Sequence, residues 1–135
     1  MSRERLVEGP VLDGSAVTKL AARSPANLAL LRNLRATGAW PARVSTVALA
    51  DCLSGDPDVD EPVLRFLGTC LLVDAVPAAL ARRGAWLRTA AGRGSAADAL
   101  TVALAEPGGS ILAGDRASNV EALALFANGV FVERV

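Results

Sequence analysis

Four aspartates stand beside apolar segments, where their carboxylates would be poorly solvated. Asp13 follows Pro-Val-Leu, Asp51 follows Val-Ala-Leu-Ala, Asp98 precedes Ala-Leu-Thr-Val-Ala-Leu-Ala, and Asp115 follows Ser-Ile-Leu-Ala-Gly. Two unit charges about 4 Å apart repel by about 4 kcal/mol at an effective dielectric constant of about 20, so clustered carboxylates need a counter-charge. A divalent cation is the obvious candidate for this counter-charge. Oxygen ligands favour Mg²⁺ or Mn²⁺ over zinc or copper.

The chain contains no histidine, which removes the usual general base and the commonest zinc ligand. The two cysteines, Cys52 and Cys70, are too few and too far apart for a zinc cluster or a thiol redox pair. We expect them to be buried free thiols in a reducing compartment. Carboxylates must therefore carry any chemistry.

Each aspartate also has a purely structural explanation. Asp13 and Asp115 could be loop or cap residues, and Asp98 completes a capping box with Ser95 at a helix start. Asp51 has the weakest such explanation, because it lies in a short apolar segment where a buried acid is costly unless it is paired or bound to metal. The four positions would need unrelated explanations, which favours a shared metal site.

Composition indicates one compact domain over residues 1–135, since 52% of residues are apolar and 21% are charged. Acidic and basic residues balance at 14 each, which argues against indiscriminate nucleic-acid binding. All but one of the basic residues are arginine, the better residue for bidentate contacts to phosphate. The chain start has no apolar signal segment and no apolar run approaches about 20 residues, so we expect a cytoplasmic protein with no membrane contact.

Short apolar runs alternate with longer helical patterns, which predicts a three-layer α/β/α sandwich around a mostly parallel sheet of about five strands. We expect strands over residues 11–13, 43–46, 70–74, 110–113 and 130–133. We expect helices over residues 15–23, 25–37, 47–53, 62–67, 77–91, 95–105 and 118–128. In the second of these helices, we expect Leu28, Leu31 and Leu34 to be core residues.

In open α/β sheets, ligands bind outside the carboxyl ends of the strands. Asp13 and Asp115 follow strands, and Asp51 and Asp98 are expected in the first turns of helices that follow a strand or loop. The four aspartates can therefore face one rim, although they are 38, 47 and 17 residues apart in the sequence.

The order of these motifs resembles the PIN domain, the metal-dependent nuclease fold of VapC-type toxins in bacterial toxin-antitoxin pairs. The matching segments cover essentially the whole chain. They are Val11–Ala16, Val47–Asp51, Ser95–Leu100, Ile111–Asp115 and Gly129–Val135.

The resemblance implies that Asp13, Asp51, Asp98 and Asp115 hold one or two Mg²⁺ or Mn²⁺ ions and that Ser15 helps to place a carboxylate or a water. Metal-activated water would hydrolyse a phosphodiester of single-stranded or loop RNA. Arginines near the rim could hold RNA phosphates, and Arg116 is the closest of them in sequence. The resemblance also implies a cognate antitoxin protein as partner and a homodimer.

Two other interpretations remain. Asp51 replaces the family's usual glutamate, Arg116 follows Asp115 where the family often has acidic or hydroxyl residues, and Ala113 and Gly114 replace a usual hydroxyl. These departures suit a PIN-fold protein with weakened catalysis that works as a binding module. A haloacid-dehalogenase-like phosphatase fits less well, because Ser15 stands where that family has a second aspartate.

Overall fold

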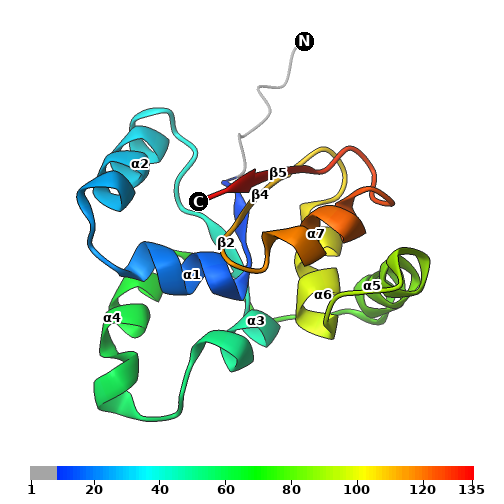
Figure 1. Ribbon diagram of the computed structural model, residues 1–135, viewed down its shortest axis with the longest axis horizontal. Helices are drawn as coiled ribbons and strands as arrows, with labels where there is room; N and C mark the ends of the chain where they lie inside the picture. The colour runs from blue at the N-terminus through cyan, green and yellow to red at the C-terminus, as the bar shows by residue number, and fades with distance from the viewer. Residues whose placement is uncertain (1–8) are drawn as a thin grey trace.

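The structure is a computed structural model that describes residues 9–135, and it confirms the predicted fold class (Figure 1). Within these residues, a five-stranded and entirely parallel sheet is combined with seven helices. The strands are β1 Val11–Leu12, β2 Arg43–Ser45, β3 Leu71–Val73, β4 Ser110–Ala113 and β5 Phe131–Arg134. Each lies within one or two residues of its predicted position. Their order across the sheet is β3-β2-β1-β4-β5.

The helices also lie close to the predicted ranges. They are α1 Gly14–Ala21, α2 Pro25–Ala36, α3 Thr46–Cys52, α4 Pro57–Leu67, α5 Ala78–Ala91, α6 Ala96–Ala105 and α7 Ala117–Ala124. Helix α4 starts five residues earlier than predicted, because the Asp56 side chain accepts from the Asp58 N–H at 3.0 Å and Pro57 occupies the first turn. Helix α7 is shorter than predicted and ends at Ala124.

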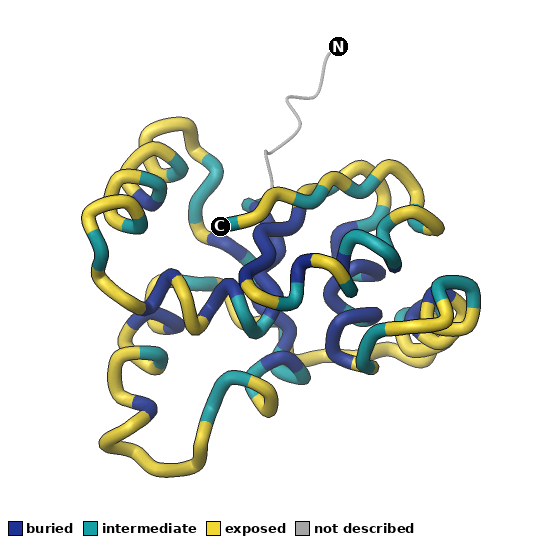
Figure 2. The backbone as a smooth tube through the Cα atoms, viewed as in Figure 1, coloured by how far each residue is buried: buried dark blue, intermediate teal, exposed yellow. Residues whose placement is uncertain are grey.

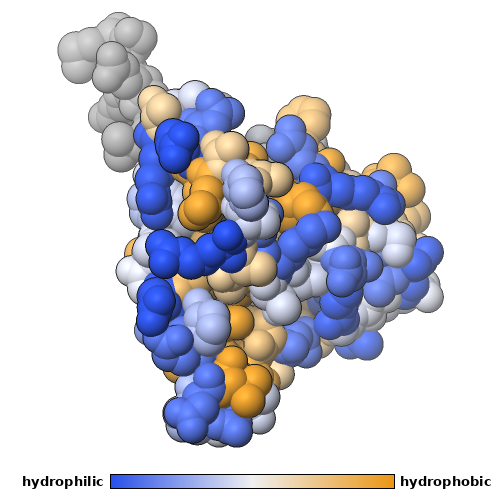
Figure 3. Space-filling model, turned by 60° about the vertical axis from the view of Figure 1, so that its left-hand side comes forward, coloured by the Kyte–Doolittle hydropathy of each residue, from blue (hydrophilic) through white to orange (hydrophobic). Residues whose placement is uncertain are grey.

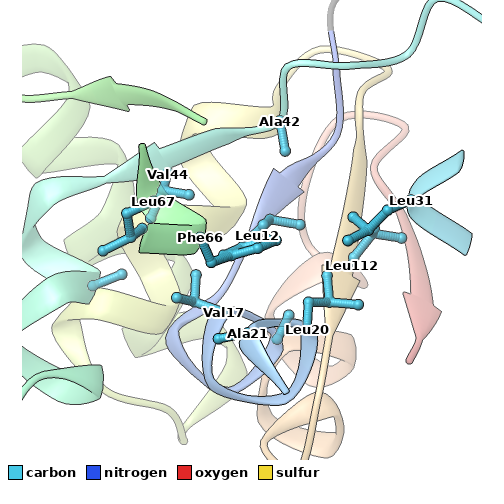
Figure 4. Packing of buried hydrophobic residues seen from close by; sticks show 12 residues of the cluster. Leu12, Val17, Leu20, Ala21, Leu31, Ala42, Val44, Phe66, Leu67 and Leu112 are labelled. Atoms are coloured by element: carbon cyan, nitrogen blue, oxygen red, sulfur yellow. The ribbon is translucent and has the colours of Figure 1, made fainter. Parts of the chain in front are cut away.

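Neighbouring residues of the central strands point to opposite faces of the sheet, and each face packs against a different set of helices. Leu12 and Leu112, which pair across β1 and β4, belong to a cluster with residues of α1, α2, α3 and α4 (Figure 4). Val11 and Ile111, which also pair, belong to a second cluster with residues of α5, α6 and α7. Figure 2 shows the buried strands between these helical layers. The arrangement is compatible with the predicted three-layer sandwich.

The prediction about the core face of α2 is confirmed for Leu31, which is buried, and Leu34 is partly buried against the same cluster. It is wrong for Leu28, which is 41% exposed. Leu28 and Leu31 line a cavity of about 610 Å³ between α1, α2 and α4, and Leu28 lies on the side of it that is open to solvent. Figure 3 shows this side of the molecule, where apolar surface lies between hydrophilic side chains.

None of the helices in the described part of the chain is both long and apolar enough to cross a membrane.

Candidate functional site

The site residues lie where the chain reverses its direction across the sheet. From β1 the chain builds outward through β2 to β3, and then returns to β4 on the other side of β1. Asp13 directly follows β1 and Gly114 directly follows β4, and the Asp13 N–H donates to the Leu112 carbonyl at 3.3 Å. The carboxyl ends of strands at such a switch point are where open α/β sheets bind ligands.

Asp13 is 1% exposed and caps the first turn of α1. Its Oδ1 accepts from the Ala16 N–H at 2.7 Å and from the Gly114 N–H at 3.4 Å. Burial raises the pKa of Asp13 above its ordinary value of 3.8, and the negative charge of Asp98 adds to the increase. The hydrogen bonds from Ala16, Ser15 and Gly114 oppose this increase but do not cancel it.

Ser15 joins the two strand ends through its hydroxyl. Ser15 Oγ lies 2.9 and 2.8 Å from the two carboxylate oxygens of Asp13 and donates to that carboxylate. The same oxygen accepts from the Gly114 N–H at 3.1 Å and from the Arg116 N–H at 3.2 Å. The resemblance gave Ser15 the role of placing a carboxylate, and its position beside Asp13 is compatible with that role.

Gly114 allows this junction to close. A Cβ atom at position 114 would lie 2.6 Å from the Ser15 carbonyl oxygen and 2.7 Å from its carbonyl carbon. Real Cβ atoms do not approach backbone so closely, so any larger residue would push the β4–α7 loop away from α1. Glycine is therefore required at position 114 for a steric reason, which could not be seen from the sequence.

Asp98 is 3% exposed and forms the predicted capping box at the start of α6. The Asp98 N–H donates to Ser95 Oγ at 3.1 Å, and the Ser95 N–H donates to Asp98 Oδ2 at 3.1 Å. The structural explanation for Asp98 is thus correct, and it does not exclude a second role, because the same Oδ2 also receives a bond from Arg116.

Arg116 reaches back across the site and holds two of the aspartates. Its Nη2 donates to Asp98 Oδ2 at 3.0 Å and to Ser95 Oγ at 3.1 Å, and its Nη1 donates to Asp51 Oδ2 at 3.3 Å. Asp51 and Asp98, which are 47 residues apart in sequence, therefore lie on either side of one guanidinium group. Sequence reasoning placed Arg116 at the rim but did not predict these ion pairs.

Asp51 differs from expectation in its burial and its position. Its side chain is 37% exposed, and it lies in the last turn of α3, not in the first. Helix α3 has only seven residues, of which Ala48 alone is buried, so the helix is too short to enclose the carboxylate. The argument that Asp51 is a costly buried acid is wrong, although Asp51 does face the other site residues through Arg116.

Asp115 is exposed, and its carboxylate makes no hydrogen bond or ion pair with any residue in the range 9–135. The structure thus connects three of the four predicted aspartates, together with Ser15, Ser95 and Arg116, and leaves Asp115 outside this network. No group of three acidic, histidine or cysteine side chains within residues 9–135 is already arranged to hold a metal ion.

Comparison with models of known protein families finds no match for this chain. Comparison with curated proteins also finds no match. The relationship to PIN domains therefore stays a prediction.

The residue types at the site fit a hard divalent cation, since the donors are carboxylate and hydroxyl oxygens. The raised pKa of the buried Asp13 shows that its surroundings do not fully compensate a negative charge there, and a cation would do so. The arrangement fits less completely, because Arg116 holds Asp51 and Asp98. A cation could use these two carboxylates only after the guanidinium group leaves them.

Proposed function

We propose that this protein is a divalent-metal-dependent endoribonuclease, the toxin of a toxin-antitoxin pair. The observation that carries the proposal is the convergence of Asp13, Asp51 and Asp98 at the switch point of the sheet. Arg116 pairs with Asp51 and Asp98, and the negative charge of Asp98 helps to raise the pKa of the buried Asp13, so three carboxylates lie near one another with one guanidinium group paired to two of them. This is the environment in which Mg²⁺ or Mn²⁺ binds.

In this proposal, Asp13, Asp98 and Asp51 hold the cation. Once bound, the cation supplies an activated water and stabilises the charge that develops on the phosphate. Ser15 keeps the Asp13 carboxylate in place by its hydrogen bond, and Ser95 does the same for Asp98 through the capping box. Arg116, released from the carboxylates, binds a phosphate of the RNA.

Cleavage of single-stranded RNA in the presence of Mg²⁺ or Mn²⁺, and its loss in Asp98→Asn, tests the proposal. The substitution keeps a similar shape but removes the charge. Asp74→Asn is the matched control, because Asp74 is exposed just after the edge strand β3 and is not part of the site. Full RNA cleavage by Asp98→Asn with unchanged metal dependence would exclude the proposed roles.

A binding module without catalysis is the second candidate, and the Arg116 ion pairs favour it. A site whose carboxylates are already neutralised in part needs no metal to be stable. The two candidates differ in one measurement: millimolar Mn²⁺ should raise the melting temperature and give a calorimetric heat only if the protein binds the cation. No heat and no thermal shift would favour the binding module.

The cavity between α1, α2 and α4 is a surface for the proposed antitoxin. Its apolar lining includes Leu28, Leu31 and Phe66. Its charged lining is Arg23, Arg32, Arg35, Arg65 and Glu61; Glu61 pairs with Arg65, so the other three arginines give the cavity its excess of positive charge. A partner segment with apolar and acidic side chains would complement it. Leu28→Asp should weaken binding of an antitoxin encoded beside this chain and leave RNA cleavage unchanged, because none of the residues lining the cavity belongs to the carboxylate site.

A further inference from the structure

The Arg116 side chain occupies the position in which a cation would have to contact Asp51 and Asp98. Its two terminal nitrogens each hold one carboxylate, and one of them also binds Ser95 Oγ. The guanidinium group therefore satisfies the carboxylates by the planar, forked contacts that suit arginine better than lysine. The contact is intramolecular, so no partner is needed to make it.

The two carboxylates depend on Arg116 to different degrees. The Asp98 side chain is 3% exposed, whereas that of Asp51 is 37% exposed. A carboxylate that is shielded from water and loses its counter-charge is destabilised far more than one that water can solvate. Arg116 is therefore more important as a counterion for Asp98 than for Asp51.

The Arg116 side chain is held by different partners from those of the Arg116 backbone. It is 36% exposed, and its backbone N–H is held separately by Ser15 Oγ at 3.2 Å. The guanidinium group and the backbone are thus attached by different bonds, so rotation of the side chain towards solvent leaves the junction between β1 and β4 intact.

We propose that Arg116 is a built-in competitor for the divalent cation, so that the cation binds only by displacing the Arg116 guanidinium from Asp98 and Asp51. This inference rests on the proposed function, since it assumes that these carboxylates bind a cation. A guanidinium and a divalent cation repel each other and share the same ligands, so occupancy by one excludes the other. Arg116 therefore lowers the affinity of the free protein for metal.

Titration of metal-free protein with Mn²⁺ by calorimetry tests the inference. Arg116→Gln removes the competing charge and should bind Mn²⁺ at least tenfold more tightly than the unmodified protein. Arg93→Gln is the control, because Arg93 bonds Asn119 Oδ1 at 2.8 and 3.0 Å and holds no site carboxylate. It removes the same charge from the neighbouring loop and should leave the Mn²⁺ affinity within about twofold of the original.

The outcomes separate this inference from the proposed function. Equal or weaker Mn²⁺ binding by Arg116→Gln, together with measurable binding by the unmodified protein, would overturn the competition and leave the metal site standing. Absence of binding in every variant would overturn the proposed function and the competition with it. A tenfold gain shared by Arg93→Gln would show a general effect of charge and would also overturn the specific role of Arg116.

A second readout does not need tight metal binding. Without metal, Arg116→Gln should melt at a lower temperature than the unmodified protein, because Asp98 loses its counterion, and saturating Mn²⁺ should remove this difference. If Arg116→Gln does not fold, Arg116→Lys takes its place in the titration. Lysine is a single point charge and cannot fork between two carboxylates, so its Mn²⁺ affinity should still exceed that of the unmodified protein. Affinity equal to or below that of the unmodified protein would overturn the inference.

Discussion

Replacing Ser15 with alanine tests the junction on which the whole site depends. The substitution removes the acceptor for two backbone N–H groups, those of Gly114 and Arg116, and the donor to the Asp13 carboxylate. Each net hydrogen bond contributes about 0.5–1.5 kcal/mol, so loss of the two backbone bonds should reduce the free energy of unfolding by about 1–3 kcal/mol. The Ser15 hydroxyl also lowers the pKa of Asp13, so that pKa should increase further in the variant.

Urea unfolding at neutral pH measures the first effect. Ser118→Ala is the control, because Ser118 is exposed on α7 and its substitution removes a hydroxyl from a helix without touching the junction. The direction of the pKa effect gives a second check: metal affinity should fall at a higher pH in Ser15→Ala than in the unmodified protein, since protons compete for Asp13. If Ser15→Ala unfolds at the same urea concentration as Ser118→Ala, the junction does not have the role assigned to it.

Further expectations concern four other positions. Gly114→Ala should lower the melting temperature and abolish metal binding, because the added Cβ would meet the Ser15 backbone at 2.6 Å; an unchanged melting curve would contradict the steric argument. Thr101→Val should raise the free energy of unfolding by about 1 kcal/mol in denaturant titrations, because the buried Thr101 hydroxyl has no hydrogen-bond partner in the described structure. Burial raises the pKa of the Cys70 thiol to about 11, so iodoacetamide should alkylate native Cys70 far more slowly at pH 8 than it alkylates the unfolded chain; equal rates would argue against the burial. The pKa of Asp13 is higher in the folded protein than its ordinary value of 3.8, so ionisation of Asp13 destabilises the folded state. This destabilisation is absent below pH 3.8, increases as the pH rises towards the folded-state pKa, and is complete above that pKa. Asp13→Asn should therefore be more stable than the unmodified protein at neutral pH, by a margin in melting temperature that shrinks as the pH is lowered towards 4; a margin independent of pH would refute this.

The sequence predicted the sheet well because its signals are local. Each strand is a short apolar run bounded by residues that start a helix or a turn, such as Asp13 after β1 and Ser45 before α3. The capping box of Asp98 could be predicted for the same reason, since Ser95 lies only three residues away. Features determined within one turn of helix were accessible to sequence reasoning.

What the sequence did not reveal depends on distant pairs of residues. The contacts of Arg116 with Asp51 and Asp98 span 65 and 18 residues, and the close approach of Gly114 to Ser15 spans 99. Periodicity contains no information about such pairs. The exposure of Asp51 was missed because apolar neighbours in sequence do not ensure burial when the helix is as short as α3.

The bond between Ser15 and the β4–α7 loop also determines when during synthesis the site can exist. Asp13, Asp51 and Asp98 leave the ribosome in that order, but the partners that hold the first strand end in place, Gly114 and Arg116, are translated after all of them. A nascent chain that ends before Gly114 contains the three carboxylates but lacks the hydrogen bonds of Ser15 to Gly114 and Arg116. If the proposed function is right, a nascent chain should therefore bind no metal ion at this site until residues 114 and 116 have been added.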